Sequence, residues 1–193
     1  MPLDILRLPS IATDRLVAVE PRFAPLFCLV LLTIACALAS FAFACATPFA
    51  AFAVVATAML PLQAALVVML ATWMVNQAIG FGALHYPFDI NTALWGFAIG
   101  VAALIATATS KLILRSLARI GSPVALTLAL IGSYASYEVA LFAFTPALGG
   151  AGAFKLAIIA RLGLLNLPWL IGLVAGCEVF GLLNPISRRR MVS

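Results

Sequence analysis

The stretch from Phe23 to Leu84 contains no charged residue in 62 consecutive positions. Roughly 20 helical residues cross the hydrocarbon core of a bilayer, so this stretch is long enough for several membrane-spanning helices. The whole composition agrees, because 65% of the residues are hydrophobic, 9% are charged and the mean hydropathy is +1.21. The sequence therefore predicts an all-α polytopic membrane protein, with a single transmembrane domain over residues 1–193.

Prolines divide the uncharged stretch into three helices. Pro48 and Pro61 lack the backbone N–H that a continuous helix needs, which predicts a break at each. The second helix is then short, and we expect it to be tilted, partly re-entrant or continued past Pro61 as a kinked helix. Basic and glycine-rich segments divide the remainder into three further helices. The six spans are expected near residues 24–46, 49–60, 62–83, 91–112, 122–145 and 154–184.

The basic residues predict the orientation of these helices. With six spans, segment 1–22, the Lys111–Arg119 cluster and Arg188–Arg190 all lie on one side of the membrane, which the positive-inside rule assigns to the cytoplasm. Both termini are then cytoplasmic, and the loop around His85 is on the outer side. Five spans would place the last two clusters outside, so six are favoured. The net charge of +5 is thereby assigned to topology and not to nucleic-acid binding.

Polar residues gather at the expected outer level of the bundle. The segment Asn76–Asn91 reads NQAIGFGALHYPFDIN and separates two long apolar stretches. On the fifth span, Tyr134 and Glu138 are four positions apart and share one helix face. Polar groups inside a membrane need a partner, a cavity or an interface, which makes these residues candidates for a ligand pocket. The candidate substrate-binding residues are Asn76, Gln77, His85, Tyr86, Asp89, Asn91, Tyr134, Glu138 and Arg161, with Trp95 and Asn166 as further contributors to the same cavity.

Each of these residues also has a structural interpretation. Aromatic residues near the membrane surface are often interface anchors or core packing. Glu138 and Arg161 are expected at a similar depth, where an ion pair would either only join two helices or form part of the pocket wall. Glu178 is expected near the cytoplasmic surface, where it reaches water or meets Lys111 or Arg115.

Metal-ligating residues are scarce. His85 is the only histidine, and it is either a hydrogen-bonded loop residue or one axial ligand to a metal that a macrocycle already holds. No P-loop, HExxH, GxSxG or paired-carboxylate motif is present, which argues against an enzyme, a nucleotide site or a cofactor of the protein's own. Four cysteines lie in apolar stretches without CxxC spacing and are expected to be small packing residues: Cys28, Cys36, Cys45 and Cys177.

Small residues recur at four-residue spacing in the first span. Such spacing lets a second helix approach closely, so these faces either pack inside the protein or dock on a partner subunit. The pairs are Ala35/Ala39, Cys36/Ser40 and Ala42/Ala46.

These features together resemble the substrate-binding S components of energy-coupling-factor vitamin transporters, and most of all their small cobalamin-specific (BtuM-like) type. The matching motif is NQAIGFGALHYP at the end of the third span. The resemblance implies a six-helix protein of the bacterial inner membrane, a vitamin pocket near the outer surface with cobalamin as the transported ligand, and an energy-coupling transmembrane subunit with ATPases that docks on the small-residue faces. The cobalamin type is expected to carry a cobalt-ligating cysteine near the outer end of the third span. This chain has none there, and His85 would be the replacement ligand.

Two functions remain open from the sequence. The first is a membrane-embedded binding or transport subunit that takes up a small molecule from the outer side. The second is a structural or assembly protein that packs against a larger membrane complex and whose polar groups only satisfy one another.

Overall fold

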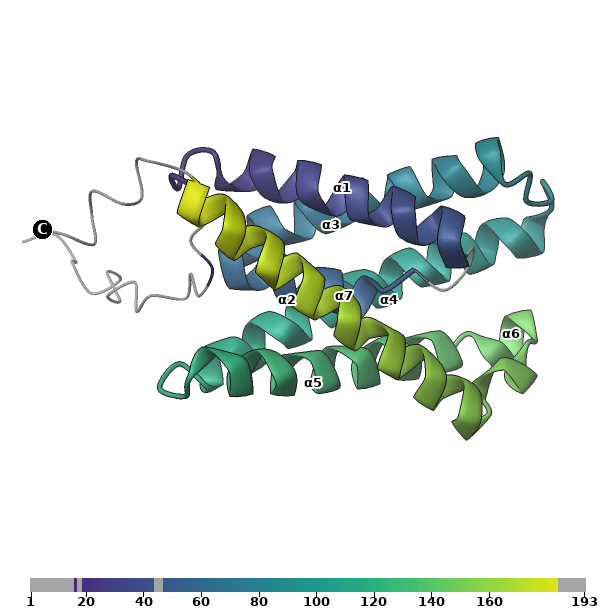
Figure 1. The fold of residues 1–193 in the computed structure, drawn as a ribbon. Coiled ribbons are helices and arrows are strands. Elements are labelled where there is room, and N and C mark those ends of the chain that lie inside the picture. The colour runs from purple at the N-terminus through teal and green to yellow at the C-terminus, as the bar shows by residue number, and fades with distance from the viewer. Residues whose placement is uncertain (1–15, 17–18, 44–46, 184–193) are drawn as a thin grey trace, which may run out of the picture.

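The computed structural model describes residues 16, 19–43 and 47–183 of the protein (Figure 1). Cys45 and the arginines of the two chain ends (Arg7, Arg15 and Arg188–Arg190) lie outside this part of the chain. The described residues form helices and turns without a strand. The elements are α1 (Ala24–Phe43), α2 (Phe49–Met59), α3 (Leu62–Ala78), η1 (Ile79–Ala83), α4 (Ile90–Ser116), α5 (Ser122–Phe142), α6 (Thr145–Leu148), η2 (Ala151–Phe154) and α7 (Leu156–Leu183).

Five helical segments are long and apolar enough to cross a membrane. Their surfaces carry large apolar side chains, as on α1, where Leu26, Ile34 and Leu38 follow one face and are each more than half exposed. An exposed apolar stripe of this kind is suited to contact with lipid chains. The prediction of an all-helical, multi-pass membrane protein is confirmed for five of the six expected spans. These five are Ala24–Ala42, Leu62–Ala83, Ile90–Ser116, Ser122–Leu148 and Leu156–Leu182.

The helix expected as the second span, α2, is too short to cross a membrane alone. Its 11 residues make about 16 Å of helix, roughly half of a 30 Å hydrocarbon core. Every residue from Phe49 to Met59 is buried, and α1, α3, α4, α5 and α7 all pack against it (Figure 1). Five of its residues are alanines, which let these neighbours approach closely. The short helix is therefore the centre of the bundle.

Side chains from other helices hold both ends of α2. Backbone groups at a buried helix end cannot reach water, so each needs a partner inside the protein. In the first turn, Oδ1 of Asn166 accepts a hydrogen bond from the N–H of Ala51 at 3.1 Å. At the other end, Nζ of Lys111 donates to the carbonyl oxygens of Thr57 and Leu60 at 2.8 and 2.7 Å. The ammonium charge also complements the negative end of the helix dipole.

Lys111 belongs in sequence to a basic cluster with Arg115 and Arg119, but it does not share their exposure. Its side chain is 1% exposed because it turns toward α2, whereas both arginines are exposed. Glu178 was expected to reach the surface or to meet Lys111 or Arg115. It is exposed on α7 and forms an ion pair with neither.

The first two small-residue pairs of α1 pack inside the protein. The thiol of Cys36 donates to the carbonyl oxygen of Thr72 on α3 at 3.6 Å. These faces are not available for the expected docking of a partner subunit, because α3 already covers them; the third pair extends beyond the described residues. The described cysteines are all buried and free, which confirms them as packing residues. The four residues of the two pairs are each at most 4% exposed: Ala35, Cys36, Ala39 and Ser40.

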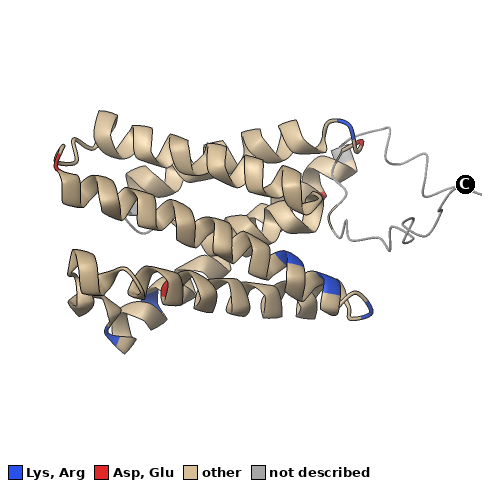
Figure 2. Cartoon of the chain, turned by 180° about the vertical axis from the view of Figure 1, so that it is seen from behind, with Lys and Arg blue, Asp and Glu red and all other residues tan. Residues whose placement is uncertain are grey.

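Basic residues lie at both ends of the bundle (Figure 1, Figure 2): Lys155 and Arg161 are at the start of α7, and three arginines are at the opposite end. The start of α1, the connection between α4 and α5 and the end of α7 lie together at one end. Arg22, Arg115 and Arg119 belong to these segments, so we call this the basic end. The connection between α3 and α4 and the segment of α6 and η2 lie at the opposite end, which we call the loop end.

Candidate functional site

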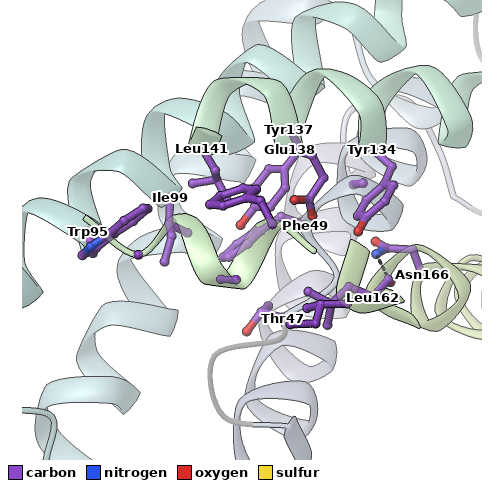
Figure 3. Close-up of a pocket in the computed structure, with 15 residues that line it drawn as sticks. Thr47, Phe49, Trp95, Ile99, Tyr134, Tyr137, Glu138, Leu141, Leu162 and Asn166 are labelled. Atoms are coloured by element: carbon purple, nitrogen blue, oxygen red, sulfur yellow. Dashed lines mark hydrogen bonds between the residues drawn. The ribbon is translucent and has the colours of Figure 1, made fainter. Parts of the chain in front are cut away.

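A cavity of about 360 Å³ lies beyond the N-terminus of α2 and is lined by residues of α4, α5, α7 and η2 (Figure 3). The cavity exists because α2 is short. The residues at the start of this helix form one wall, and side chains of the longer helices line the space beyond them. The lining residues are Thr47, Phe49, Ala50, Trp95, Ile99, Tyr134, Tyr137, Glu138, Leu141, Gly150, Ala153, Phe154, Ile158, Leu162 and Asn166.

Three helices each present one face to the cavity. Lining residues that are three or four positions apart stand on the same side of a helix, which explains how three separate segments converge on one space. The faces are Tyr134, Tyr137, Glu138 and Leu141 on α5, Ile158, Leu162 and Asn166 on α7, and Trp95 and Ile99 on α4.

Close packing between α5 and α7 positions Tyr134. A Cβ atom added to Gly163 would lie 2.8 Å from Cε1 of the Tyr134 ring, so the ring rests directly on the α7 backbone. The Tyr134 hydroxyl donates to the carbonyl oxygen of Ile159 at 2.7 Å. The side chain is thus held at both its ring and its hydroxyl, which makes it a rigid part of the cavity wall.

The segment before α7 borders the cavity at the loop end. Gly149 and Gly150 both have φ of +79°, a left-handed conformation that favours glycine. A Cβ atom on Gly150 would lie 3.3 Å from Cζ2 of Trp95, so this backbone packs against the indole ring. Phe154 is anchored by the ring of Phe142, with centroids 5.3 Å apart. The lid of the cavity is therefore a tight glycine turn supported by aromatic contacts.

Glu138 is the only charged residue among those that line the cavity. Its half-buried carboxylate lies beside the Tyr134 hydroxyl and points toward the cavity (Figure 3). The predicted ion pair with Arg161 is not formed: within the part of the chain that the structure describes, the one ion pair joins Arg22 and Glu20. The reason is the helical register, since Leu162 faces the cavity and Arg161 is turned about 100° away from it, where it is exposed.

Asn76 and Gln77 lie behind the cavity wall. Nδ2 of Asn76 donates to the hydroxyl oxygens of Ser40 at 3.0 Å and of Thr47 at 2.9 Å. Nε2 of Gln77 donates to Oδ1 of Asn76 at 3.1 Å, and its own Oε1 occupies the space where a Cβ of Gly96 would be. These contacts join α3 to α1, to α4 and to Thr47, two residues before the start of α2. Asn76 thus reaches the site only through Thr47, which lines it.

Of the other residues predicted from the segment 76–91, His85, Tyr86 and Asp89 lie in the connection between α3 and α4, at the loop end. His85 is exposed and has φ of +54°, and the N–H of Tyr86 donates to the carbonyl oxygen of Gly80 at 3.0 Å. Asn91 is exposed in the first turn of α4. The connection contributes no residue to the cavity. The residues described contain no group of three or more His, Cys, Asp and Glu side chains that could hold a metal ion.

Asp89 has a structural role as the N-cap of α4. Its Oδ1 accepts a hydrogen bond from the backbone N–H of Thr92 at 2.8 Å, and its Oδ2 accepts one from the Thr92 hydroxyl at 3.0 Å. These hydrogen bonds, the backbone one first, hold the pKa of Asp89 below its ordinary value. The aspartate thus satisfies a free N–H group at the start of the helix, as N-cap residues do.

The structure brings together two of the nine candidate residues, Tyr134 and Glu138, and also the two further contributors, Trp95 and Asn166. Most of what the sequence missed is apolar lining, such as Phe49 and Leu162, for which an apolar helix sequence contains no distinguishing signal. Comparison with models of protein families, with curated proteins and with solved structures found no match to this chain.

Proposed function

We propose that the protein is a membrane-embedded subunit that binds a small molecule from the outer side of a bacterial inner membrane and takes part in its uptake. The observation that carries this proposal is the partly open cavity past the N-terminus of α2. Its volume of about 360 Å³ is within the range of sites for small ligands, and its wall is mainly apolar with a few polar groups, as such sites usually are.

The orientation in this proposal comes from the positive-inside rule. Arg22, Arg115 and Arg119 lie at the basic end and outnumber Lys155 and Arg161 at the start of α7, so the rule assigns the basic end to the cytoplasm. The lid of the cavity is at the loop end, so the site faces outward. Chain segments at the basic end would then meet any cytoplasmic energy source.

The resemblance to S components adds an energy-coupling partner with ATPases, and a vitamin as the ligand. Since α3 covers the first two small-residue pairs of α1, such a partner would bind another surface. His85 lies outside the cavity, so a corrinoid ligand is supported by the resemblance alone. Addition of cobalamin tests that version: a shift of its absorption spectrum that is lost in His85→Ala would support it.

Native mass spectrometry of the protein in lipid nanodiscs tests the proposed function. We expect a retained small molecule in the wild type and its loss in Leu162→Trp, which fills the cavity. The matched control is Ile131→Trp, a change at an exposed position of α5. A wild-type protein that retains and binds no small molecule, but purifies in fixed stoichiometry with other membrane proteins, would refute uptake and support the assembly function instead.

A further inference from the structure

We infer that the cavity takes an organic cation, with the Glu138 carboxylate as its counter-charge and aromatic rings as its walls. This inference rests on the proposed function, and it specifies the chemical class of the ligand. The class that it identifies is an amine or a positively charged heterocycle with an apolar body.

The charge of the cavity comes from Glu138 alone. No described cationic side chain forms an ion pair with it, and the basic residues nearest in sequence to the lining, Lys155 and Arg161, are exposed and are not part of the lining. An ionised carboxylate that is partly removed from water inside a membrane protein is costly unless a nearby positive charge or a bound proton neutralises it. A ligand cation in the cavity would supply that charge.

The walls around this carboxylate are aromatic. Phe49, Trp95, Tyr134, Tyr137 and Phe154 all line the same space. The rings of Phe49 and Tyr137 lie 6.3 Å apart between centroids, so they form a continuous surface beside the carboxylate. The faces of aromatic rings carry partial negative charge and attract cations, most strongly where water is excluded. Both the charged group and the walls of the site therefore favour the same sign of ligand charge.

The N-terminus of α2 also borders the cavity, and its dipole alone would favour an anion. The protein itself uses two of the N–H groups of this turn: Phe49 donates to the carbonyl oxygen of Thr47 at 2.9 Å, and Ala51 donates to Asn166 at 3.1 Å. The partial charge of about one half at a helix end is also smaller than the full charge of a carboxylate. The balance remains in favour of a cation.

The test compares two ligands of similar shape and different charge. N-methyl-4-phenylpyridinium is a permanent cation, and 4-phenylpyridine is neutral at pH 7.5. Binding of each to nanodisc-embedded protein is measured by equilibrium dialysis, for wild type, Glu138→Gln and Glu178→Gln. The last variant removes an exposed carboxylate of α7 outside the cavity and serves as the matched control.

We expect the wild type to bind the cation more tightly than the neutral compound. Glu138→Gln should lower the affinity for the cation by about 30-fold, the change that corresponds to losing one partner of a close charge pair, and Glu178→Gln should leave it unchanged. Trp95→Leu should also lower the affinity for the cation. Its melting temperature should equal that of the wild type, which would show that the fold is intact.

Equal binding of the cation by wild type and Glu138→Gln would overturn the inference, as would tighter binding of the neutral compound. If the wild type retains a neutral or anionic molecule that Leu162→Trp displaces, the ligand class is wrong while the proposed uptake function stands. If neither compound binds and no molecule is retained, both the inference and the proposed function fail.

Discussion

Replacement of Lys111 by methionine tests whether α2 is held in place by its buried cap. Methionine matches the length of the lysine side chain without its charge, so it leaves the carbonyl oxygens of Thr57 and Leu60 without their donor. Each hydrogen bond from a charged group is worth roughly 1.5–3 kcal/mol. Against this loss, the variant no longer buries an ammonium group, which is itself costly.

The net effect should be a decrease of about 2–4 kcal/mol in the free energy of unfolding. It can be measured by titrating the protein from mild detergent into SDS and following tryptophan fluorescence. Arg115→Met is the control, because it removes the same charge one turn further along α4, from an exposed position. That control should change the free energy by no more than about 0.5 kcal/mol.

Equal stability of Lys111→Met and Arg115→Met would refute this account of the α2 cap. Such a result would mean that the two carbonyl oxygens find other partners or that packing alone holds the helix. A loss in Lys111→Met that Lys111→Arg largely restores would support the cap, since arginine keeps both the charge and the donors.

Three further outcomes follow from contacts near the site. Asn166→Leu removes the cap on the first turn of α2 and should lower the free energy of unfolding by about 1–2 kcal/mol in the same SDS titration; no loss would show that the cap is dispensable. Gly163→Ala places a methyl group against the Tyr134 ring and should cost about 1–3 kcal/mol, and a double-mutant cycle with Tyr134→Ala should remove most of that cost. Asp89 accepts hydrogen bonds from Thr92 that lower its pKa, so its stabilisation is complete above the ordinary carboxyl pKa and is lost as the pH falls through the lowered pKa. The melting temperature of wild type should therefore fall toward that of Asp89→Asn in acid, and parallel curves would contradict this role.

The boundaries of the helices followed from local signals in the sequence. Charge-free length, prolines and basic segments predicted each long helix to within a few residues, because a bilayer requires apolar runs of a minimum length. The position of α2 within the membrane could not be predicted from the sequence. Pro48 and Pro61 mark the ends of a helix but do not indicate how far it extends across a membrane. The same 11 residues would suit a tilted span or a buried plug.

The site shows the same division between local and tertiary information. The spacing of Tyr134 and Glu138 identified two residues that do line the cavity, since helical periodicity is a local property. The segment 76–91 has a more conspicuous polar sequence, but the hydrogen bonds of Asn76 and Gln77 join neighbouring segments behind the cavity, and those of Asp89 cap α4. Arg161 was misplaced, and the burial of Lys111 was missed, for a related reason: which side of a helix faces the interior depends on the neighbours that pack against it.

The double capping of α2 has a consequence for biosynthesis. Residues 49–59 leave the ribosome early, yet the side chain that binds their first turn is 115 positions away from Ala51 on the last helix. A helix of this length has little stability of its own, and the lysine that holds its other end arrives only with α4. The segment therefore cannot make its final contacts until synthesis is nearly finished. The centre of the bundle is then one of the last parts of the protein to reach its final structure, and truncation before α7 should leave a chain that is inserted but not folded.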